Sequence, residues 1–141
     1  MIILLKIKFD AATISYISLF ERVTKASVKD CIMADSLIIF IVDENELGKA
    51  LGKHAANVHA LEANLKKKVK VIEYSSDLVK FIEHIIYPIK AQEITEEGGI
   101  VTIVPSDSRS RGYLIGRNAQ ILRQNESIVK RYFEISEIKV V

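Results

Sequence analysis

The sequence has little of the material that secreted, metal-binding or aromatic-rich proteins use. Among 141 residues there is a single cysteine, Cys31, and there is no tryptophan. One thiol forms no internal disulfide and excludes a cysteine-based zinc site, which favours a reducing, cytoplasmic compartment. Five tyrosines and five phenylalanines leave little material for a broad binding surface built on aromatic stacking.

Long apolar runs and catalytic motifs are absent as well. The runs LIIFIV and MIILL are far shorter than the roughly 20 residues that span a bilayer, so we expect no membrane partner. The N-terminal stretch MIILLKIKF is interpreted as a strand on an exposed edge that supports dimerisation. No carboxylate pair beside a histidine, nucleophile motif, Walker motif or dinucleotide fingerprint occurs. We therefore expect no enzyme, no cofactor and no small-molecule substrate.

Charge is distributed unevenly, although the formal net charge is only +2. Residues 49–70 carry six lysines against one acid, and residues 105–131 carry six lysines or arginines against two acids. The rest of the chain is acidic in balance. Two basic islands in an otherwise acidic chain indicate a polyanionic partner, because clustered cations attract phosphate groups.

The two basic islands belong to an internal repeat. The stretch ALGKHAANVHALEANLKKKVKVIE, which begins at residue 50, aligns with LIGRNAQILRQNESIVKRYFEISEIKVV, which begins at residue 114. Gly52 then falls on Gly116, and Lys53 falls on Arg117. A repeat of this length indicates two copies of one structural unit.

Each half of the repeat predicts the same order of elements: helix, strand, strand, helix, glycine loop, helix, strand. We therefore expect an α/β chain, more narrowly α+β, with one domain at 1–74 and a second at 75–141. The predicted opening helices lie within 11–26 and 75–90. In the second stretch Ser75 and Asp77 are the candidate N-caps, and Pro88 ends the helix. The predicted strands are 27–33, 37–43, 68–73, 89–97, 100–105 and 137–141.

Gly52 and Gly116 each follow a short predicted helix, and another helix begins within three or four residues. Glycine adopts a positive φ there without strain and ends the first helix. The unpaired amides that open the next helix form a small anion site, and Lys53 and Arg117 add charge beside it. One such corner is more often only a turn, but two matched corners inside basic islands favour phosphate binding.

His54 and His59 raise the question of a metal site. Their spacing is i, i+5 and no third ligand lies nearby in the sequence, so we expect no metal. His54 is expected at the exposed tip of the loop, near phosphate.

The order of elements and the glycine loop resemble the KH domain in its type II arrangement, whose GxxG loop clamps single-stranded RNA. The tandem pair and the stretches ISLFERVTKASVKDCI, ELGKALGKHAANVHALE and YLIGRNAQILR resemble the archaeal NusA-like transcription factors over residues 10–141. The resemblance implies two tandem type II KH domains, each a three-stranded sheet with helices packed on one face. It implies an RNA-binding factor in transcription termination or antitermination, with single-stranded RNA as its partner and RNA polymerase as a second one.

The resemblance also implies the residues of the RNA site. In the first domain the matching positions are Gly52, Lys53, His54, Ala55, Asn57 and Val58. In the second domain they are Gly116, Arg117, Asn118, Ala119, Leu122 and Arg123. The apolar residues among them would receive bases, whereas Leu61 is expected in the core.

One loop position departs from the family pattern, because Ala55 and Ala119 stand where the family has a second glycine. If this position has a helical φ, alanine costs nothing. If a phosphate passes over it, the methyl group loosens the clamp. We interpret the change as weakened but retained RNA binding. The alternative is a protein-interaction module of KH shape with weak or no RNA binding, which docks on RNA polymerase or ribosomal components.

Overall fold

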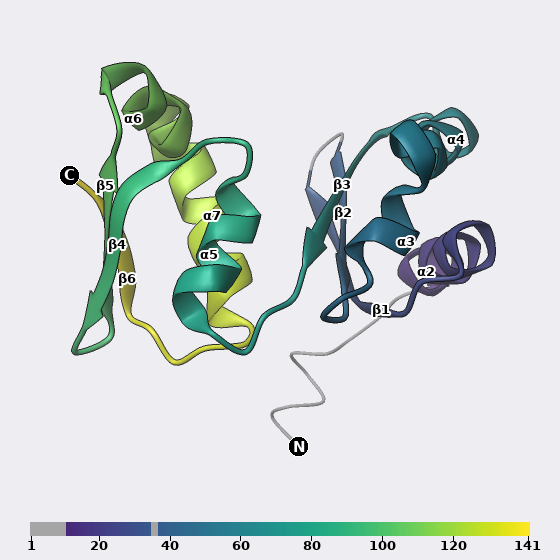
Figure 1. The fold of residues 1–141 in the computed structure, drawn as a ribbon, viewed down its shortest axis with the longest axis horizontal. Helices are drawn as coiled ribbons and strands as arrows, with labels where there is room; N and C mark the ends of the chain where they lie inside the picture. The colour runs from purple at the N-terminus through teal and green to yellow at the C-terminus, as the bar shows by residue number, and fades with distance from the viewer. Residues whose placement is uncertain (1–10, 35–36) are drawn as a thin grey trace. The chain divides into compact units, whose positions relative to one another are not determined.

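The computed structural model describes residues 11–34 and 37–141, and these form two compact units (Figure 1). Unit 1 ends at Ser75 and unit 2 runs from Ser76 to Val141. The interpretation of MIILLKIKF as an edge strand concerns residues outside the described part of the chain.

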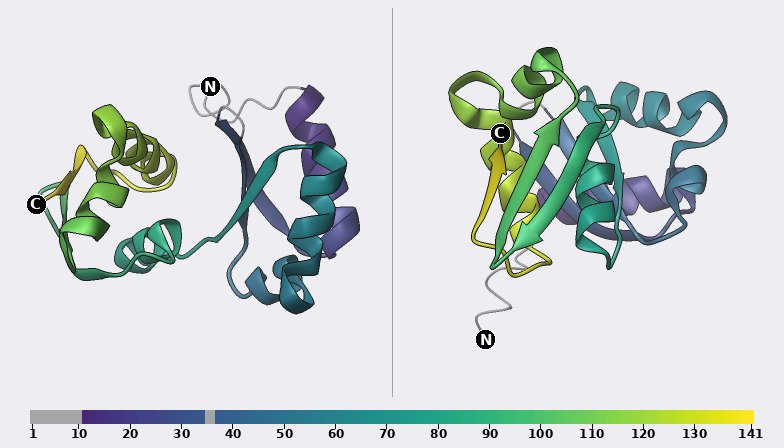
Figure 2. Two further views of the ribbon diagram at one scale, coloured as in Figure 1. Left: turned by 90° about the horizontal axis from the view of Figure 1, so that it is seen from above. Right: turned by 60° about the vertical axis from the view of Figure 1, so that its left-hand side comes forward.

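Unit 1 is a three-stranded sheet covered by helices on one face (Figure 2). Its elements are α2 (Ala11–Thr24), β1 (Val28–Ala34), β2 (Leu37–Val42), α3 (Leu47–Leu51), the 3₁₀ turn Lys53–Ala55, α4 (Ala56–Leu65) and β3 (Lys68–Glu73). β1 and β2 pair antiparallel, whereas β3 pairs parallel to β2. The parallel pair requires a crossover, and the α3–α4 segment supplies it.

Unit 2 repeats this architecture. Its elements are α5 (Leu78–Ile86), β4 (Ala91–Glu97), β5 (Ile100–Pro105), α6 (Ser108–Ile115), the 3₁₀ turn Arg117–Ala119, α7 (Gln120–Lys130) and β6 (Glu137–Val140). β4 pairs antiparallel and β6 parallel with the central strand β5. A shift of register near the start of the hairpin occurs in both units, between Val28 and Asp30 and between Ala91 and Glu93. The predicted α+β fold and the predicted order of elements are confirmed.

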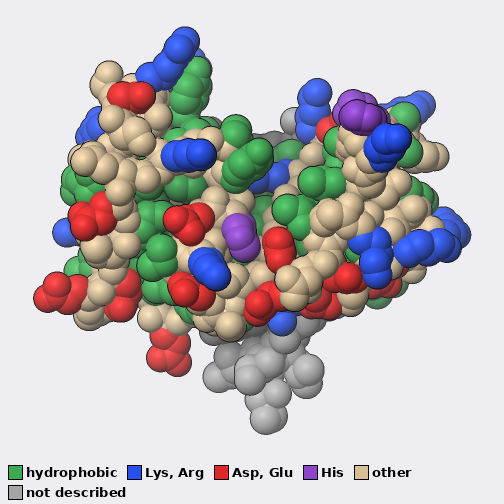
Figure 3. Space-filling view, viewed as in Figure 1, with side chains coloured by type: hydrophobic (Ala, Val, Ile, Leu, Met, Phe, Trp, Pro, Cys, Tyr) green, Lys and Arg blue, Asp and Glu red, His purple; other side chains and the backbone are tan. Residues whose placement is uncertain are grey.

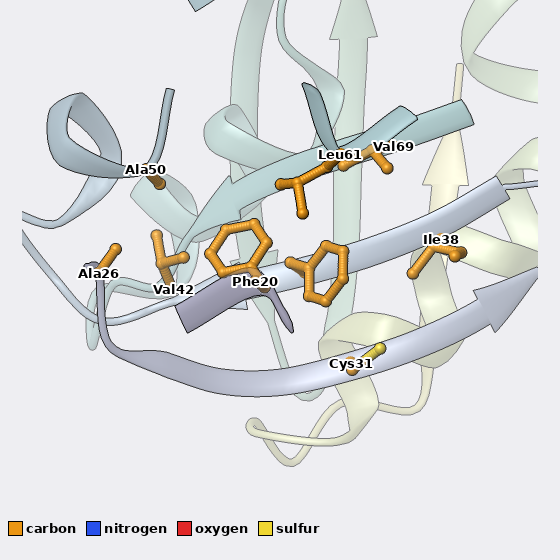
Figure 4. Close-up of a cluster of buried hydrophobic side chains, with 9 residues drawn as sticks. Phe20, Ala26, Cys31, Ile38, Val42, Ala50, Leu61 and Val69 are labelled. Atoms are coloured by element: carbon orange, nitrogen blue, oxygen red, sulfur yellow. The ribbon is translucent and has the colours of Figure 1, made fainter. Parts of the chain in front are cut away.

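The core of unit 1 lies between its sheet and its helices (Figure 4). Phe20 of α2 and Phe40 of β2 stack with their ring centroids 4.2 Å apart, and both side chains are fully buried. Complete burial of one such side chain stabilises the fold by about 1.5–3 kcal/mol. Ile38, Phe40 and Val42 alternate along β2 and belong to this core. Leu61 is fully buried in the core, as expected.

The first helix of unit 2 lies within the predicted segment 75–90, between the expected cap at Asp77 and Pro88. The side chain of Asp77 caps α5 by accepting hydrogen bonds from the amides of Val79 (3.0 Å) and Lys80 (3.3 Å). The helix ends at Ile86, because Pro88 forces the preceding Tyr87 into an extended conformation. Helix α5 thus begins at its cap and buries an apolar stripe, with Phe81, Ile82, Ile85 and Ile86 facing the core of unit 2.

Candidate nucleic-acid interface

The two glycine loops have the same backbone conformation. Gly52 has φ 72° and ψ 178°, and Gly116 has φ 75° and ψ 178°. This region of backbone space is essentially restricted to glycine. The predicted positive φ is therefore confirmed at both glycines, and each loop needs this residue for its geometry.

The third and fourth residues of each loop are left-handed. His54 and Asn118 have φ near 55°, and the fourth residues, Ala55 and Ala119, have φ 57° and 60°. The condition under which alanine would cost nothing, a right-handed helical φ, is therefore not met at this position. A left-handed alanine brings its Cβ close to the following carbonyl group, at a cost of about 1–2 kcal/mol. The substitution of alanine for glycine is therefore strained in both units.

The hydrogen bonds within each loop do not use the amides of its second and third residues. The amide of Ala55 donates to the carbonyl of Gly52 (3.2 Å), and that of Ala56 donates to the carbonyl of Lys53. In unit 2 the amide of Ala119 donates to the carbonyl of Gly116 (3.3 Å) in the same way. Within the described residues, no acceptor is recorded for the amides of the second and third loop residues, which are Lys53 and His54 in unit 1 and Arg117 and Asn118 in unit 2. Donors of this kind, placed just before a helix, suit an anion.

The charged side chains of the loops are exposed. Lys53 and His54 in unit 1 and Arg117 in unit 2 all face solvent. Basic side chains gather over α4 of unit 1 and over α6 of unit 2, whereas acidic ones surround the β4–β5 turn (Figure 3). Lys70 is not part of a solvated basic surface, since it is half-buried on β3 and burial lowers its pKa.

A different side chain lies behind each glycine. A Cβ on Gly52 would lie 2.8 Å from Nδ2 of Asn57, and a Cβ on Gly116 would lie 2.7 Å from Cγ1 of Ile121. The amide of Asn57 also donates to the carbonyl of Lys49 (3.1 Å), at the end of α3. The amide group of Asn57 thus stabilises the corner between α3 and α4, and its role toward RNA stays a prediction.

The apolar candidates contribute less surface than expected. Val58 is half-buried and packs against the core of unit 1. Leu122 is only 8% exposed and lines a small internal cavity with Ile82 and Ile138. Leu122 therefore supports the loop from beneath, and we do not carry it into the proposed interface. Arg123 is 55% exposed, although its guanidinium group pairs with Glu126 at 2.9 Å.

Sequence reasoning missed one matched pair of acids. Glu62 accepts the amide of Val69 at the start of β3 (2.9 Å), and Glu126 accepts the amide of Ile138 in β6 (2.8 Å). Each carboxylate thus ties the helix after the loop to the last strand of its unit. The signal was present in the sequence, because Glu62 and Glu126 are separated by the same offset as the two glycines.

The helices that lead into the loops differ in charge. In unit 2, Asp107 caps α6 by accepting the amide of Ser110 (2.7 Å), and this bond lowers the pKa of Asp107. The first turn of α6 then carries two exposed arginines, Arg109 and Arg111. In unit 1 the corresponding segment contains Glu46, whose carboxylate lies 3.5 Å from the ammonium group of Lys49. The basic surface therefore extends farther from the loop in unit 2.

Residues 11–34 and 37–141 contain no cluster of three or more histidine, cysteine, aspartate or glutamate residues suited to a metal ion. None of the helices in this part of the chain has the length and apolar character needed to cross a membrane.

These features define a class of protein. Each unit has the order helix, strand, strand, helix, loop, helix, strand, and its last strand pairs parallel to the central one. This is the type II KH arrangement. A family model described as "KH domain" matches residues 15–94.

Similar proteins narrow the class. The chain is 32% identical over 139 residues to the "Probable transcription termination protein NusA" of Methanocaldococcus jannaschii, which covers 96% of this chain and 76% of that protein. It is 34% identical over 140 residues to the protein of the same name from Methanococcus vannielii, covering 97% and 81%. The crystal structure of the protein APE1850 has the same fold, with a TM-score of 0.73 at 24% identity over 94% of this chain and all of that one. The chain therefore belongs to the archaeal NusA-like family of tandem KH-domain proteins.

Proposed function

We propose that this protein binds single-stranded RNA through both of its loops, GKHA and GRNA, and acts as a non-catalytic factor in transcription termination or antitermination. The domains that carry the two loops correspond to residues 1–74 and 75–141. The transcriptional role is proposed because the similar archaeal proteins are named as probable transcription termination proteins. RNA polymerase is the second partner in this proposal.

One observation carries the proposal: the two loops repeat the same backbone path in two units of different sequence. Gly52 and Gly116 differ by 3° in φ, and the left-handed residues after them match as closely. A corner that served only to connect two helices would not need an alanine in a strained conformation twice. Along this strained path two amides have no acceptor within the loop and an exposed cation lies in the same loop, a combination that suits a phosphate.

The contacts offered by the loops are suited to the RNA backbone more than to particular bases. Amides and exposed cations neutralise phosphate and give an affinity that falls as salt rises. For a single strand, the logarithm of the binding constant falls by about 0.7 per contacted phosphate for each tenfold increase in salt. We therefore expect modest sequence preference at the loops themselves and a clear salt dependence.

The test is a titration of labelled single-stranded RNA at two salt concentrations. The loop variant changes Lys53, His54, Arg117 and Asn118 to Asp. A matched control changes Arg22, Lys25 and Lys80, exposed cations on other elements, to Asp and lowers the formal charge by the same amount. Wild type and control are expected to bind with a similar salt slope, and the loop variant is expected to lose binding while its circular dichroism spectrum is unchanged.

The alternative function, a protein-interaction module without RNA binding, is favoured by one observation. The methyl groups of Ala55 and Ala119 stand in the path that a phosphate takes over the loop. If wild type fails to bind RNA at low salt, or if the loop variant and the control lose affinity equally, the RNA proposal is wrong and the interaction module takes its place.

A further inference from the structure

We propose that Tyr113 is a base-stacking residue: with Ile121 it forms an exposed apolar platform that receives one nucleobase of the RNA strand held by the loop of unit 2. This inference rests on the proposed function and adds to it a contact that unit 1 lacks. No feature of the family match assigns a role to Tyr113.

The first observation is exposure at a particular place. Tyr113 is 55% exposed and Ile121 is 42% exposed, and they lie on α6 and α7, the two helices that the loop connects. Tyr113 lies three residues before Gly116, roughly one helical turn of 5.4 Å. Ile121 lies directly behind Gly116, with Cγ1 2.7 Å from the position a Cβ would take. The two side chains therefore flank the glycine of the loop.

The second observation is that the ring of Tyr113 is unoccupied. Among the described residues no ring contact, ion pair or hydrogen bond is recorded for its side chain. Two other tyrosine rings have partners: Tyr74 lies under the ammonium group of Lys29, at 4.5 Å, and Tyr132 packs edge-on against Phe81. An exposed aromatic ring beside an anion site is what nucleobase stacking requires.

Unit 1 shows what the same position looks like without the platform. The alignment that places Gly52 on Gly116 places Lys49 on Tyr113 and Asn57 on Ile121. Lys49 pairs with Glu46 at 3.5 Å, and the amide of Asn57 bonds to the carbonyl of Lys49. These polar groups satisfy one another and offer no flat apolar surface. Stacking is therefore confined to unit 2.

The test compares four proteins: wild type, Tyr113→Ala, Tyr113→Phe and Tyr87→Ala. Tyr87 is the control, because it is 71% exposed and lies on the connection between α5 and β4, which is not one of the two glycine loops. Each protein is titrated with a short single-stranded RNA and with the same RNA made of abasic nucleotides. Tyr113→Ala is expected to weaken binding of the normal RNA roughly 5- to 150-fold, the range for loss of one stacked base.

Two readouts separate stacking from a change of structure. Tyr113→Ala should leave affinity for the abasic RNA and the slope of affinity against salt unchanged, because phosphate contacts remain. Tyr113→Phe should bind as wild type does, since the ring is kept. In addition, an RNA containing 5-iodouridine should crosslink on irradiation to the wild-type peptide that contains Tyr113, as identified by mass spectrometry.

The outcomes distinguish this inference from the function on which it rests. If wild type binds no RNA, the proposed function and the stacking role of Tyr113 are both wrong. If wild type binds but Tyr113→Ala binds equally well, or weakens both RNAs alike, the loops bind RNA and only the stacking role of Tyr113 is wrong. A crosslink that maps to another residue while Tyr113 stays unmodified would also overturn it.

Discussion

The two loops of this protein share a backbone path and differ in nearly every side chain around it. The glycines, the left-handed third and fourth residues and the acid that reaches the last strand are repeated in both units. The residue behind the glycine is Asn57 in unit 1 and Ile121 in unit 2, and the helix before the loop carries one lysine in unit 1 and two arginines in unit 2. The comparison separates what the corner requires from what each unit is free to vary.

The largest expected difference between the units follows from the atoms behind the glycines. Gly116→Ala places a methyl group 2.7–3.0 Å from three atoms of Ile121, including its Cβ, which cannot move without the helix. We expect a loss of about 2–5 kcal/mol from backbone strain and overpacking together. Gly52→Ala meets only the flexible end of Asn57, so we expect a loss of about 1–3 kcal/mol.

Urea unfolding followed by circular dichroism measures both effects. The double variant Gly116→Ala with Ile121→Ala separates much of the two causes, because it removes the contacts with Cγ1 and Cδ1 of residue 121 and keeps the backbone strain and the 3.0 Å contact with Cβ. Its loss of stability should be smaller than the sum of the two single losses. Equal losses for Gly52→Ala and Gly116→Ala would show that the side chain behind the glycine is irrelevant.

The acids that tie helix to strand give the next difference. Glu126 is 9% exposed, accepts the amide of Ile138 and also pairs with Arg123, whereas Glu62 is half-buried and accepts the amide of Val69. Removal of the acceptor leaves a buried amide without a partner, which costs about 1–3 kcal/mol. We expect a loss of about 2–4 kcal/mol for Glu126→Ala and about 1–2 kcal/mol for Glu62→Ala, because only the first also leaves a cation unpaired.

Amide hydrogen exchange checks the cause as well as the size. Exchange at Ile138 should accelerate in Glu126→Ala, and exchange at Val69 should accelerate in Glu62→Ala. The conservative variants Glu126→Gln and Glu62→Gln keep an acceptor oxygen, so they should restore much of the protection. If the amides exchange at wild-type rates in the alanine variants, the carboxylates do not hold the strands.

Regular elements could be predicted from the sequence because each follows from a local pattern. The strands predicted at 68–73 and 100–105 agree with β3 and β5, since alternating or continuous apolar residues bounded by turns define them. The limits of α5 could also be predicted, because Asp77 is a typical N-cap residue and Pro88 cannot continue a helix.

The conformation of the loops was only partly predictable. A positive φ at Gly52 and Gly116 could be expected because glycine at the end of a helix commonly adopts one. Nothing in an alanine signals a left-handed φ, so the strain at Ala55 and Ala119 became visible only in the structure. The burial of Leu122 and the bond from Asn57 to Lys49 depend on tertiary packing, which a spacing between residues does not encode.

A charge reversal confined to one loop tests whether the units contribute unequally to RNA binding. We expect the pair Arg117→Asp with Asn118→Asp to weaken binding roughly 10- to 100-fold, and the pair Lys53→Asp with His54→Asp to weaken it roughly 3- to 10-fold. The reason is that Arg109 and Arg111 extend the positive surface beside the second loop. Anisotropy of labelled RNA at two salt concentrations measures both, and a larger effect from the unit 1 pair would reverse the ranking.

The smallest expected effect concerns the one loop position at which the two units agree with each other and depart from the family. Ala55→Gly and Ala119→Gly each relieve a left-handed alanine but also make the unfolded chain more flexible, so the gain in stability should be about 0.5 kcal/mol or less. Removal of the methyl group should raise RNA affinity, because it clears the path of the phosphate. The effect is expected in both variants, since the backbone conformation is nearly the same, with φ 57° at one position and 60° at the other. Ala119→Val is the opposing control, because a β-branched side chain tolerates this φ poorly and should destabilise unit 2. If the glycine variants bind RNA more weakly than wild type, the methyl groups are contacts that assist the RNA rather than obstacles to it.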